Sequence, residues 1–199
     1  LKSFGIEGVD SIKNNWQNNP ITYMLIAENA QTGELGAGLR LDVVDPSHPI
    51  PLEEALLSLS PGIVPRIHKF NHVLAELCGL WVNENYRGYR LPVALVRSAI
   101  SVASKLRISV LLSFSALHSK PILEPFGFTP ISGIPNNASF NYPDERYKSI
   151  LLELELFGKY SMSHGEDQII NNLKKNPHYI LYDQMKDLPF TLEYDLRLI

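Results

Sequence analysis

The stretch from Val73 to Leu106 constrains this chain most, because it changes abruptly from one periodicity to another. It opens with VLAELCGLWV, an apolar run of strand length that is rich in Val, Leu and Trp. A polar loop containing a glycine, NENYRG, follows, and YRLPVALVRSAISVASKL then places apolar residues at helical spacing. The sequence therefore predicts a strand, a tight loop and a helix in direct succession.

Apolar residues of the helical half recur on one helical face, whereas Arg97 and two serines lie on another. The residues of the apolar face are Val93, Val96, Ile100 and Ala103. Pro92 suits the first turn, since its missing N–H breaks no helical hydrogen bond there. The pattern predicts a helix from Pro92 to Leu106 whose apolar stripe packs on a sheet.

The start of this helix is a candidate anion site. A helix that begins at Pro92 aims free backbone N–H groups and a partial positive charge at the loop, and Arg87 and Arg90 add two full charges. Phosphate groups occupy sites of this kind. An ordinary strand-to-helix connection with solvated arginines has the same pattern, so the loop alone leaves both interpretations open.

The loop resembles motif A of the GNAT superfamily of N-acetyltransferases. In that motif a central strand leads to Arg/Gln-x-x-Gly-x-Gly/Ala and then to a helix whose N-terminus holds the pyrophosphate of coenzyme A. The matching residues run from Arg87 to Pro92, RGYRLP. The arginine, the next glycine and the helix match, whereas Arg90 and Pro92 replace the two motif glycines. Arg90 could supply by charge what the backbone loses.

A second segment supports the resemblance. Pro125 to Ile131, PFGFTPI, is similar to the Leu-Gly-Phe-x-Pro/Val segment of the same family. The residues before it predict a strand over Ile108 to Phe114, and His118 to Phe128 resembles the family's helix ending in a Gly-Phe pair, so the resemblance implies a helix there. Two motifs in this order and at the family's spacing are more specific than either motif alone.

The resemblance covers Ile21 to Phe157 and implies an α/β protein of GNAT-like acyl-CoA N-acyltransferase fold. We expect a mixed, mostly antiparallel sheet flanked by helices in residues 1–157, with an insertion at 45–70, and a C-terminal extension, 158–199, packed on the same domain. The resemblance implies acyl transfer, most simply acetyl transfer, from acetyl-CoA or another acyl-CoA to the amine of a small molecule or amino acid. Direct attack on the thioester is the implied mechanism.

Two alternative functions stay open. One is transfer of a longer chain from coenzyme A or an acyl carrier protein. The other is a catalytically silent module of the same fold that binds a ligand or partner. Under the enzyme interpretation, acyl-CoA lies in a V-shaped opening beside the central strand. The residues that the resemblance assigns to the cofactor are Trp81, Val82, Arg87, Gly88, Tyr89, Arg90 and Leu91.

Glu76 is the candidate general base, because GNAT enzymes often place an acidic residue on the central strand. A carboxylate among Leu, Ala and Trp is also expected to have a raised pKa. An ion-paired or edge-exposed glutamate on the outward face is the alternative. Ala75 to Val82 is more weakly similar to the Glu-x-Ser-Arg-Phe-x-Val segment of acyl-homoserine-lactone synthases, but Gly79 stands at the position of the arginine.

The residue that protonates the leaving thiolate is less clear from the sequence. In the family a tyrosine four residues before the motif glycine does this, and that position is Leu123 here. His118, Ser115 or Tyr86 could substitute, and His118 is the best placed because it opens the same helix. An exposed histidine at a helix start is the alternative. A thiolate can also leave unassisted, because its pKa is modest.

Turn signals and periodicity divide the rest of the chain. They predict a helix from Ser3 to Asn19 and a hairpin of two strands, Ile21 to Glu28 and Leu35 to Val44. Within the insertion, prolines frame a short helix, Leu52 to Leu59, in either a binding loop or a surface embellishment. Later elements are a strand over Tyr147–Phe157, a helix over Glu166–Lys175, and strands over Tyr179–Asp183 and Thr191–Ile199.

Composition excludes several classes of function. Eighteen basic and 21 acidic residues give a net charge of −3 without a long run of either sign, which argues against nucleic acid as a partner. The single cysteine, Cys78, excludes an intrachain disulfide and suits a strand core. His68 and His72 have the spacing of a metal clamp on a helix, but Pro65 predicts a loop and no third ligand is near, so we expect no metal.

No apolar run approaches the roughly 18 residues that a membrane-spanning helix needs, and no signal peptide is visible. We therefore expect a cytoplasmic protein without a membrane partner, acting on a small-molecule amine. A homodimer is left open.

Overall fold

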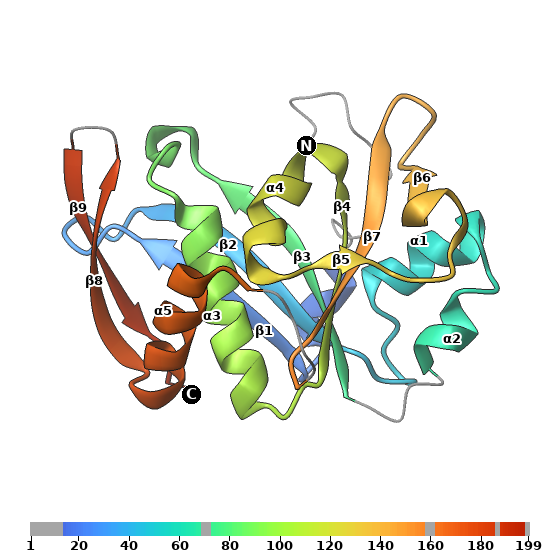
Figure 1. The fold of residues 1–199 in the computed structure, drawn as a ribbon, viewed down its shortest axis with the longest axis horizontal. Helices are drawn as coiled ribbons and strands as arrows, with labels where there is room; N and C mark the ends of the chain where they lie inside the picture. Colours follow the sequence, from blue (N-terminus) through green and yellow to red (C-terminus); the bar gives the residue numbers. More distant parts are fainter. Residues whose placement is uncertain (1–13, 69–72, 158–161, 186–187, 198–199) are drawn as a thin grey trace.

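The computed structural model describes residues 14–68, 73–157, 162–185 and 188–197. In these ranges a sheet of seven strands lies between helices, as the α/β prediction requires (Figure 1). Its strands are β1 (Thr22–Glu28), β2 (Leu35–Val43), β3 (Leu74–Val82), β4 (Val110–Ala116), β5 (Thr129–Pro130), β6 (Ser139–Asn141) and β7 (Lys148–Glu155). They are arranged in the order β1-β2-β3-β4-β7-β5, with β6 also on β7.

Strands β3 and β4 pair in parallel, whereas the other pairs of this sheet are antiparallel. The mixed, mostly antiparallel sheet is therefore confirmed. The helices are α1 (Pro51–Leu59), α2 (Val64–His68), α3 (Leu91–Lys105), α4 (Lys120–Leu123) and α5 (His164–Lys175). No helix of the described residues is long and apolar enough to cross a bilayer.

The predicted succession of strand, loop and helix is present as β3, a 3₁₀ turn over Glu84–Tyr86, and α3. The predicted hairpin is present as β1 and β2, and its two strands pair in antiparallel register. Both predictions rested on a change or alternation of apolar spacing within one segment, which is the strongest local signal of secondary structure.

The sheet separates two hydrophobic cores, because neighbouring residues of a strand point to opposite faces. On β4, Leu111 packs into the larger core with α3 and α4, whereas Leu112 packs into a smaller core with α1 and α2. β3 alternates in the same way, with Leu77 on the α3 face and Leu74 on the α1 face. The insertion thus covers the sheet face opposite α3.

Two local predictions are wrong. Pro65 does not make a loop, because it lies in the first turn of α2, where a proline leaves no helical hydrogen bond unmade. The helix predicted over His118 to Phe128 is broken into a 3₁₀ turn, the short α4 and a second 3₁₀ turn. Pro125 lacks the N–H that a continuous helix needs, and α4 ends two residues before it.

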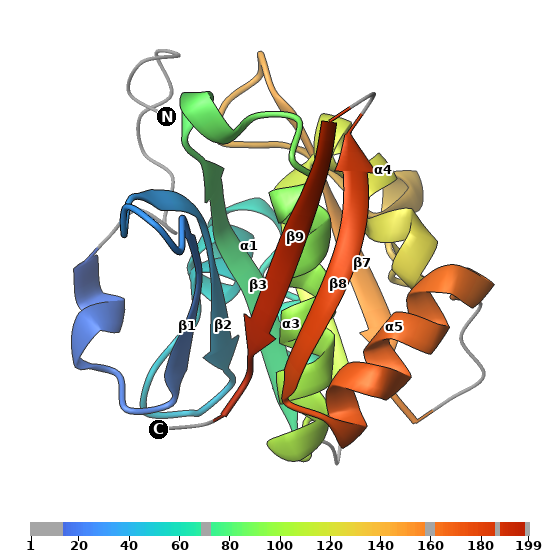
Figure 2. The same ribbon diagram turned by 90° about the vertical axis from the view of Figure 1, so that its left-hand side faces the viewer.

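The C-terminal extension lies over α3 (Figure 2). It consists of α5 and a separate hairpin of β8 (His178–Met185) and β9 (Leu188–Asp195). Ile170, Leu173 and Tyr194 of the extension belong to the same core as α3. At the other end of the chain, Asn14–Asn18 form a 3₁₀ helix, and the remainder of the helix predicted from Ser3 lies outside the described residues.

Candidate active site

A gap opens in the sheet where its two parallel strands separate. β3 and β4 pair from Leu74 to Glu76 and from Val110 to Leu112, and no pairing between them follows along the rest of either strand. The later part of β4 stays paired with β7, and the later part of β3 stays paired with β2. The two strands therefore form the V-shaped opening that the resemblance implied.

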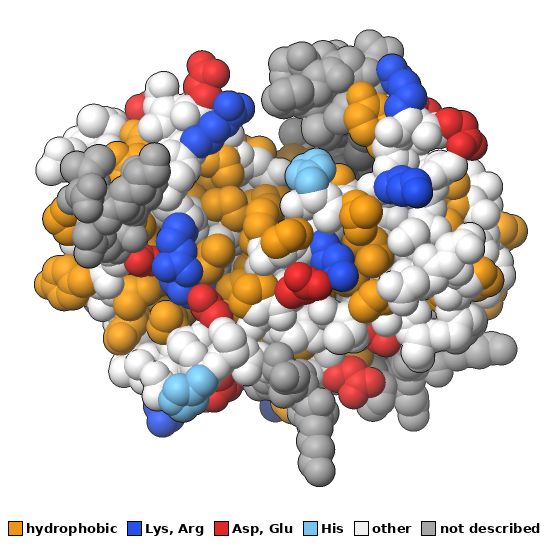
Figure 3. All heavy atoms as spheres, turned by 45° about the horizontal axis from the view of Figure 1, so that its top comes forward, with side chains coloured by type: hydrophobic (Ala, Val, Ile, Leu, Met, Phe, Trp, Pro, Cys, Tyr) orange, Lys and Arg blue, Asp and Glu red, His pale blue; other side chains and the backbone are white. Residues whose placement is uncertain are grey.

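A cavity passes through this gap, since its walls come from both faces of the sheet. Figure 3 shows a hollow at the top of the molecule in which hydrophobic side chains gather. Residues of the α3 face that line the cavity are Leu39, Leu77, Val96, Ser113, Ser115, Ile122 and Leu123. Residues of the α1 face are Pro51, Leu52, Ala55, Glu76, Cys78, Phe114 and Tyr142.

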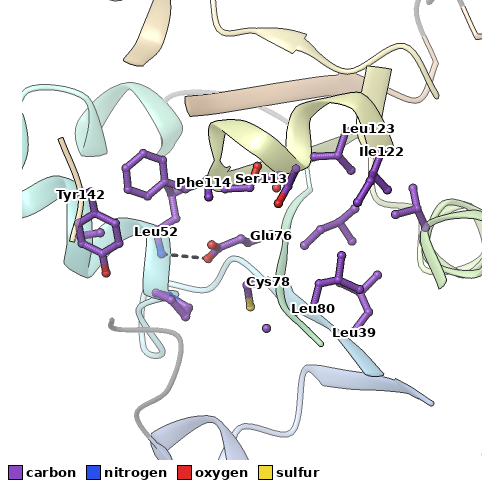
Figure 4. Close-up of a pocket in the computed structure, with 18 residues that line it drawn as sticks. Leu39, Leu52, Glu76, Cys78, Leu80, Ser113, Phe114, Ile122, Leu123 and Tyr142 are labelled. Carbon is purple, nitrogen blue, oxygen red and sulfur yellow. Dashed lines mark hydrogen bonds between the residues drawn. The ribbon is translucent and has the colours of Figure 1, made fainter. Parts of the chain in front are cut away.

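Glu76 projects from β3 into the α1 side of this cavity (Figure 4). It is 2% exposed, so the alternative of an edge-exposed glutamate is wrong. The backbone N–H of Leu52, in the first turn of α1, donates to Glu76 Oε2 over 2.9 Å. The insertion therefore holds the carboxylate in place, a contact between residues 24 positions apart that no sequence pattern indicated.

Burial raises the pKa of Glu76 from 4.5 to about 8, because the charged carboxylate loses its hydration. The Leu52 N–H and the charge of Arg40 lower this pKa, whereas the charge of Asp42 raises it further. The raised pKa that the sequence predicted is thus present. A carboxylate with a pKa near neutral pH is suited to accept a proton.

A buried polar row lies beside Glu76 on the same sheet face. In the register of β2 and β3, Asp42 is opposite Glu76 and Arg40 is opposite Cys78. Arg40 Nε donates to Asp42 Oδ2 over 2.8 Å, and the Cys78 thiol donates to the same oxygen over 3.2 Å. Arg40 and Asp42 were missed from the sequence, although two charges at strand spacing within an apolar run were a visible signal.

Cys78 is buried among these groups. Burial raises the pKa of its thiol well above the ordinary value of 9.0. A thiol held in this protonated state is a poor nucleophile, which agrees with the predicted core role.

The cavity wall contains a β-bulge. Gly79 and Leu80 of β3 lie opposite a single residue of β2, Leu39, where the register shifts. Gly79 has φ +63°, a left-handed conformation that glycine adopts at little cost. Both bulge residues line the cavity.

The loop before α3 is anchored to the β1–β2 turn. Asn83 Nδ2 donates to the carbonyl oxygen of Leu35 over 3.2 Å, and the Tyr86 hydroxyl donates to Glu34 over 2.9 Å. Gly88 has φ +91°, and Arg90, the residue before α3, has φ +53°. Two residues in the left-handed conformation, Gly88 and Arg90, therefore turn the loop into the start of α3.

No protein-family model matches this sequence, and no curated protein sequence matches it. Several solved structures match the fold of this chain. One is an N-acyl amino acid synthase from uncultured soil microbes, FeeM, at a TM-score of 0.59 and 14% identity over 78% of this chain and 83% of that chain. Another is the CoA-dependent acyl-homoserine lactone synthase MesI, at a TM-score of 0.53 and 16% identity over 79% of this chain and 71% of that one.

A third is the CoA-dependent acyl-homoserine lactone synthase BjaI, solved with SAM and isopentyl-CoA, at a TM-score of 0.50 and 12% identity. It matches over 80% of this chain and 67% of that one. The chain has the GNAT acyltransferase fold. At these identities the likeness concerns the fold, and the chemistry has to be argued from the residues.

Arg90 has a backbone conformation that is uncommon for a residue with a side chain. The first motif glycine falls on Arg90, whose left-handed φ of +53° is the conformation that a glycine adopts freely. A residue with a side chain thus stands in a left-handed conformation at the position where the resembling motif has a glycine. Arg87 is exposed in the same loop, and Leu91 is buried at the first position of α3.

The other residues predicted to hold the cofactor surround this loop without lining the cavity. Tyr89 packs edge-on against Phe190 of the C-terminal hairpin, with ring centroids 5.4 Å apart. Val82 packs against the larger core, and the partly exposed ring of Trp81 lies over Gly38 of β2. Their roles toward a GNAT cofactor stay predictions.

The structure separates the candidates for thiolate protonation. His118 is exposed in the 3₁₀ turn before α4 and does not line the cavity. The Tyr86 hydroxyl is bonded to Glu34, away from the cavity. Ser115 lines the cavity, and its buried Oγ has no hydrogen-bond partner among the described residues. Leu123, at the position of the GNAT tyrosine, also lines the cavity.

Within the described ranges, no three His, Cys, Asp or Glu side chains gather as metal ligands. His68 pairs with Glu53 of α1, and His72 lies outside those ranges.

Proposed function

We propose that this protein is an acyl-CoA-dependent N-acyltransferase. The observation that carries the proposal is the cavity through the gap between β3 and β4, with the buried carboxylate of Glu76 in its wall. Such an opening gives a thioester and an amine access to the same point from opposite faces of the sheet. The GNAT fold supports the proposal, because the solved proteins that share it include two CoA-dependent synthases.

In the proposed reaction, the nitrogen of a neutral amine attacks the thioester carbon, and the carbon–sulfur bond then breaks. Glu76 accepts the proton that the ammonium form loses, for which its raised pKa of about 8 is suited. The backbone N–H groups of the Gly79–Leu80 bulge are our candidates to hold the oxyanion. As the carbon–sulfur bond breaks, the nitrogen loses its second surplus proton, and this proton passes to the departing thiolate by way of Ser115 or a water molecule; His118 does not line the cavity and would act only through water.

The donor's phosphates are proposed to bind at the N-terminus of α3. Arg87 offers an exposed guanidinium there, and the helix adds its partial positive charge. Arg87→Ala is therefore expected to weaken coenzyme A binding by roughly tenfold, the loss of one charge-assisted contact.

The acyl chain is the open part of the proposal. Acetyl transfer is the simplest form. A longer chain is the second candidate, because the α3 side of the cavity has an apolar wall that includes Leu39, Val96 and Leu123. The names of FeeM, an N-acyl amino acid synthase, and of BjaI, solved with isopentyl-CoA, agree with this candidate and with an amino acid as one acceptor.

Calorimetric titration with coenzyme A, acetyl-CoA and a long-chain acyl-CoA tests the donor. Saturable binding that Arg87→Ala weakens supports the acyltransferase, and the ranking of the three ligands identifies the chain length. Release of free thiol from the best donor, with a panel of amines and amino acids, then tests the reaction. Donor binding without thiol release for any acceptor would favour a silent module.

A further inference from the structure

The C-terminal hairpin brings a carboxylate to the loop that is proposed to bind phosphate. Asp183 of β8 accepts hydrogen bonds from Arg90 Nη1 at 3.3 and 3.2 Å, one to each carboxylate oxygen. Glu166 of α5 lies on the other side of the same guanidinium, 3.9 Å from Arg90 Nη2. The Arg90 side chain is 46% exposed and that of Asp183 is 15% exposed, so this contact lies at the surface beside the start of α3.

The position of Asp183 is fixed by contacts along the whole length of α3. Arg97, two turns after Arg90, binds Glu166 through two hydrogen bonds of 2.6 and 2.8 Å. Lys105, at the end of the helix, donates to the carbonyl oxygen of Leu196 over 2.9 Å. The hairpin is therefore held beside the loop by the same helix whose N-terminus the phosphates would reach.

Asp183 competes with a phosphate for Arg90, because both of its hydrogen bonds come from Nη1 of that guanidinium. A phosphate at the start of α3 needs the guanidinium groups of the loop, and one of them is occupied by Asp183. The carboxylate also repels any anion that approaches the same place. Arg87, in the same loop, forms no ion pair within the described part of the chain, so it is the guanidinium that remains available in this state.

We propose that Asp183 weakens donor binding by holding Arg90 in an ion pair. Binding of the donor exchanges this pair for one between Arg90 and a phosphate. The inference rests on the proposed acyl-CoA site and adds an internal competitor to it. It also gives the C-terminal extension a role at the donor site besides covering α3.

The test is calorimetric titration of the full chain with coenzyme A, comparing the unaltered protein with Asp183→Asn, which keeps the shape and removes the charge. We expect Asp183→Asn to lower Kd about threefold to fivefold, the scale of an exposed ion pair. Asp195→Asn is the matched control, because Asp195 lies opposite His178 at the other end of the hairpin. It is expected to leave Kd unchanged.

The same substitution in an Arg90→Ala background shows whether Asp183 acts through Arg90. If it does, Asp183→Asn changes Kd less than about twofold in that background. An equal gain with and without Arg90 would mean simple repulsion and would overturn the proposed exchange. Thermal unfolding of each variant checks that the hairpin remains folded.

Two further outcomes separate this inference from the function on which it rests. If Arg87→Ala weakens coenzyme A binding while Asp183→Asn leaves it unchanged or weakens it, the acyl-CoA site stands and the inference is wrong. If neither the unaltered protein nor Asp183→Asn binds coenzyme A, both are wrong.

Discussion

Glu76 combines near-complete burial with a place in the wall of an open cavity. Its pKa of about 8 means that the carboxylate is largely protonated at neutral pH and becomes a base as the pH rises. If Glu76 is the general base, kcat rises with pH and levels off above about 8. The pH dependence of the reaction would then follow from the burial of Glu76, because burial is what raises its pKa.

We expect Glu76→Gln to lower kcat by roughly 10²- to 10⁴-fold, the usual contribution of a general base. Coenzyme A affinity is expected to stay within about twofold, because Glu76 lies on the α1 face of the cavity and the charged loop does not line that cavity. The measurement is kcat of Glu76→Gln and of the unaltered protein from pH 6 to pH 10, a range that extends about two pH units on either side of the pKa of Glu76. A profile whose rise near pH 8 survives in Glu76→Gln would exclude this role.

The same residue links stability to pH. Between pH 4.5 and about 8 the folded protein keeps a proton on Glu76 that the unfolded chain has lost. The contribution of Glu76 to the free energy of unfolding is therefore fully present below pH 4.5. It decreases as the pH rises from there and is lost above about 8. The Glu76→Gln variant has no such dependence at this position, so removing the carboxyl group stabilises the protein most at alkaline pH.

Urea unfolding at pH 5 and pH 9 measures this effect. From pH 5 to pH 9, the free energy of unfolding of Glu76→Gln is expected to rise relative to that of the unaltered protein by on the order of a few kcal/mol. Glu155→Gln, in the exposed part of β7, is the control and is expected to follow the unaltered protein. Parallel stability curves for Glu76→Gln and the unaltered protein would contradict the raised pKa.

Helix α3 shows what the sequence could and could not predict. Its bounds and its apolar stripe followed from periodicity within one segment, and β1, β2 and β3 were predicted for the same reason. The burial of the polar face of α3 could not be predicted from its spacing. Arg97 is 2% exposed and Ser101 is fully buried, since α5 packs on α3 and Tyr194 of the hairpin contacts Arg97.

The partner of Arg97 lies 69 residues further along the chain, so no local pattern could identify it. The same reason applies to the candidate site. Glu76 and the loop arginines were found from residue type and motif, whereas the Leu52 contact, Arg40 and Asp42, Tyr142 and the bulge depend on which segments the fold brings together. The helix that the resemblance implied after β4 is broken, because Pro125 lacks the N–H that a continuous helix needs there.

The pair between Arg97 and Glu166 is expected to hold α5 on α3. Arg97→Met removes both hydrogen bonds to Glu166 and leaves this buried carboxylate with Arg90, 3.9 Å away, as its nearest cation. It also removes the contact of 3.4 Å from Arg97 Nη1 to the Tyr194 hydroxyl. The expected loss is about 3 kcal/mol in the free energy of unfolding by urea, the lower end of the cost of breaking a buried ion pair, because Arg90 still compensates part of the charge. The double variant Arg97→Met/Glu166→Met is expected to recover most of it. A single variant as stable as the unaltered protein would show that the pair adds little.

At the scale of the whole molecule, the C-terminal extension and the GNAT-like part share one core. Four residues of the extension pack in the same core as residues of α3 and β2: Ile170, Leu173, Tyr194 and Leu196. The sheet of the extension consists of the two strands β8 and β9. A two-stranded hairpin is marginally stable by itself in water. The extension therefore depends on α3 for its burial, and α3 depends on the extension to cover Arg97.

From this mutual dependence we predict that the chain unfolds in one cooperative transition. Differential scanning calorimetry is expected to give a single peak whose calorimetric and van't Hoff enthalpies agree. Arg97→Met is expected to lower the temperature of that peak without splitting it, because the contact it breaks lies inside the shared core. Two resolved transitions would instead mean that residues 158–199 fold as a separate unit, and the carboxylate of Asp183 would then have no fixed place beside the loop.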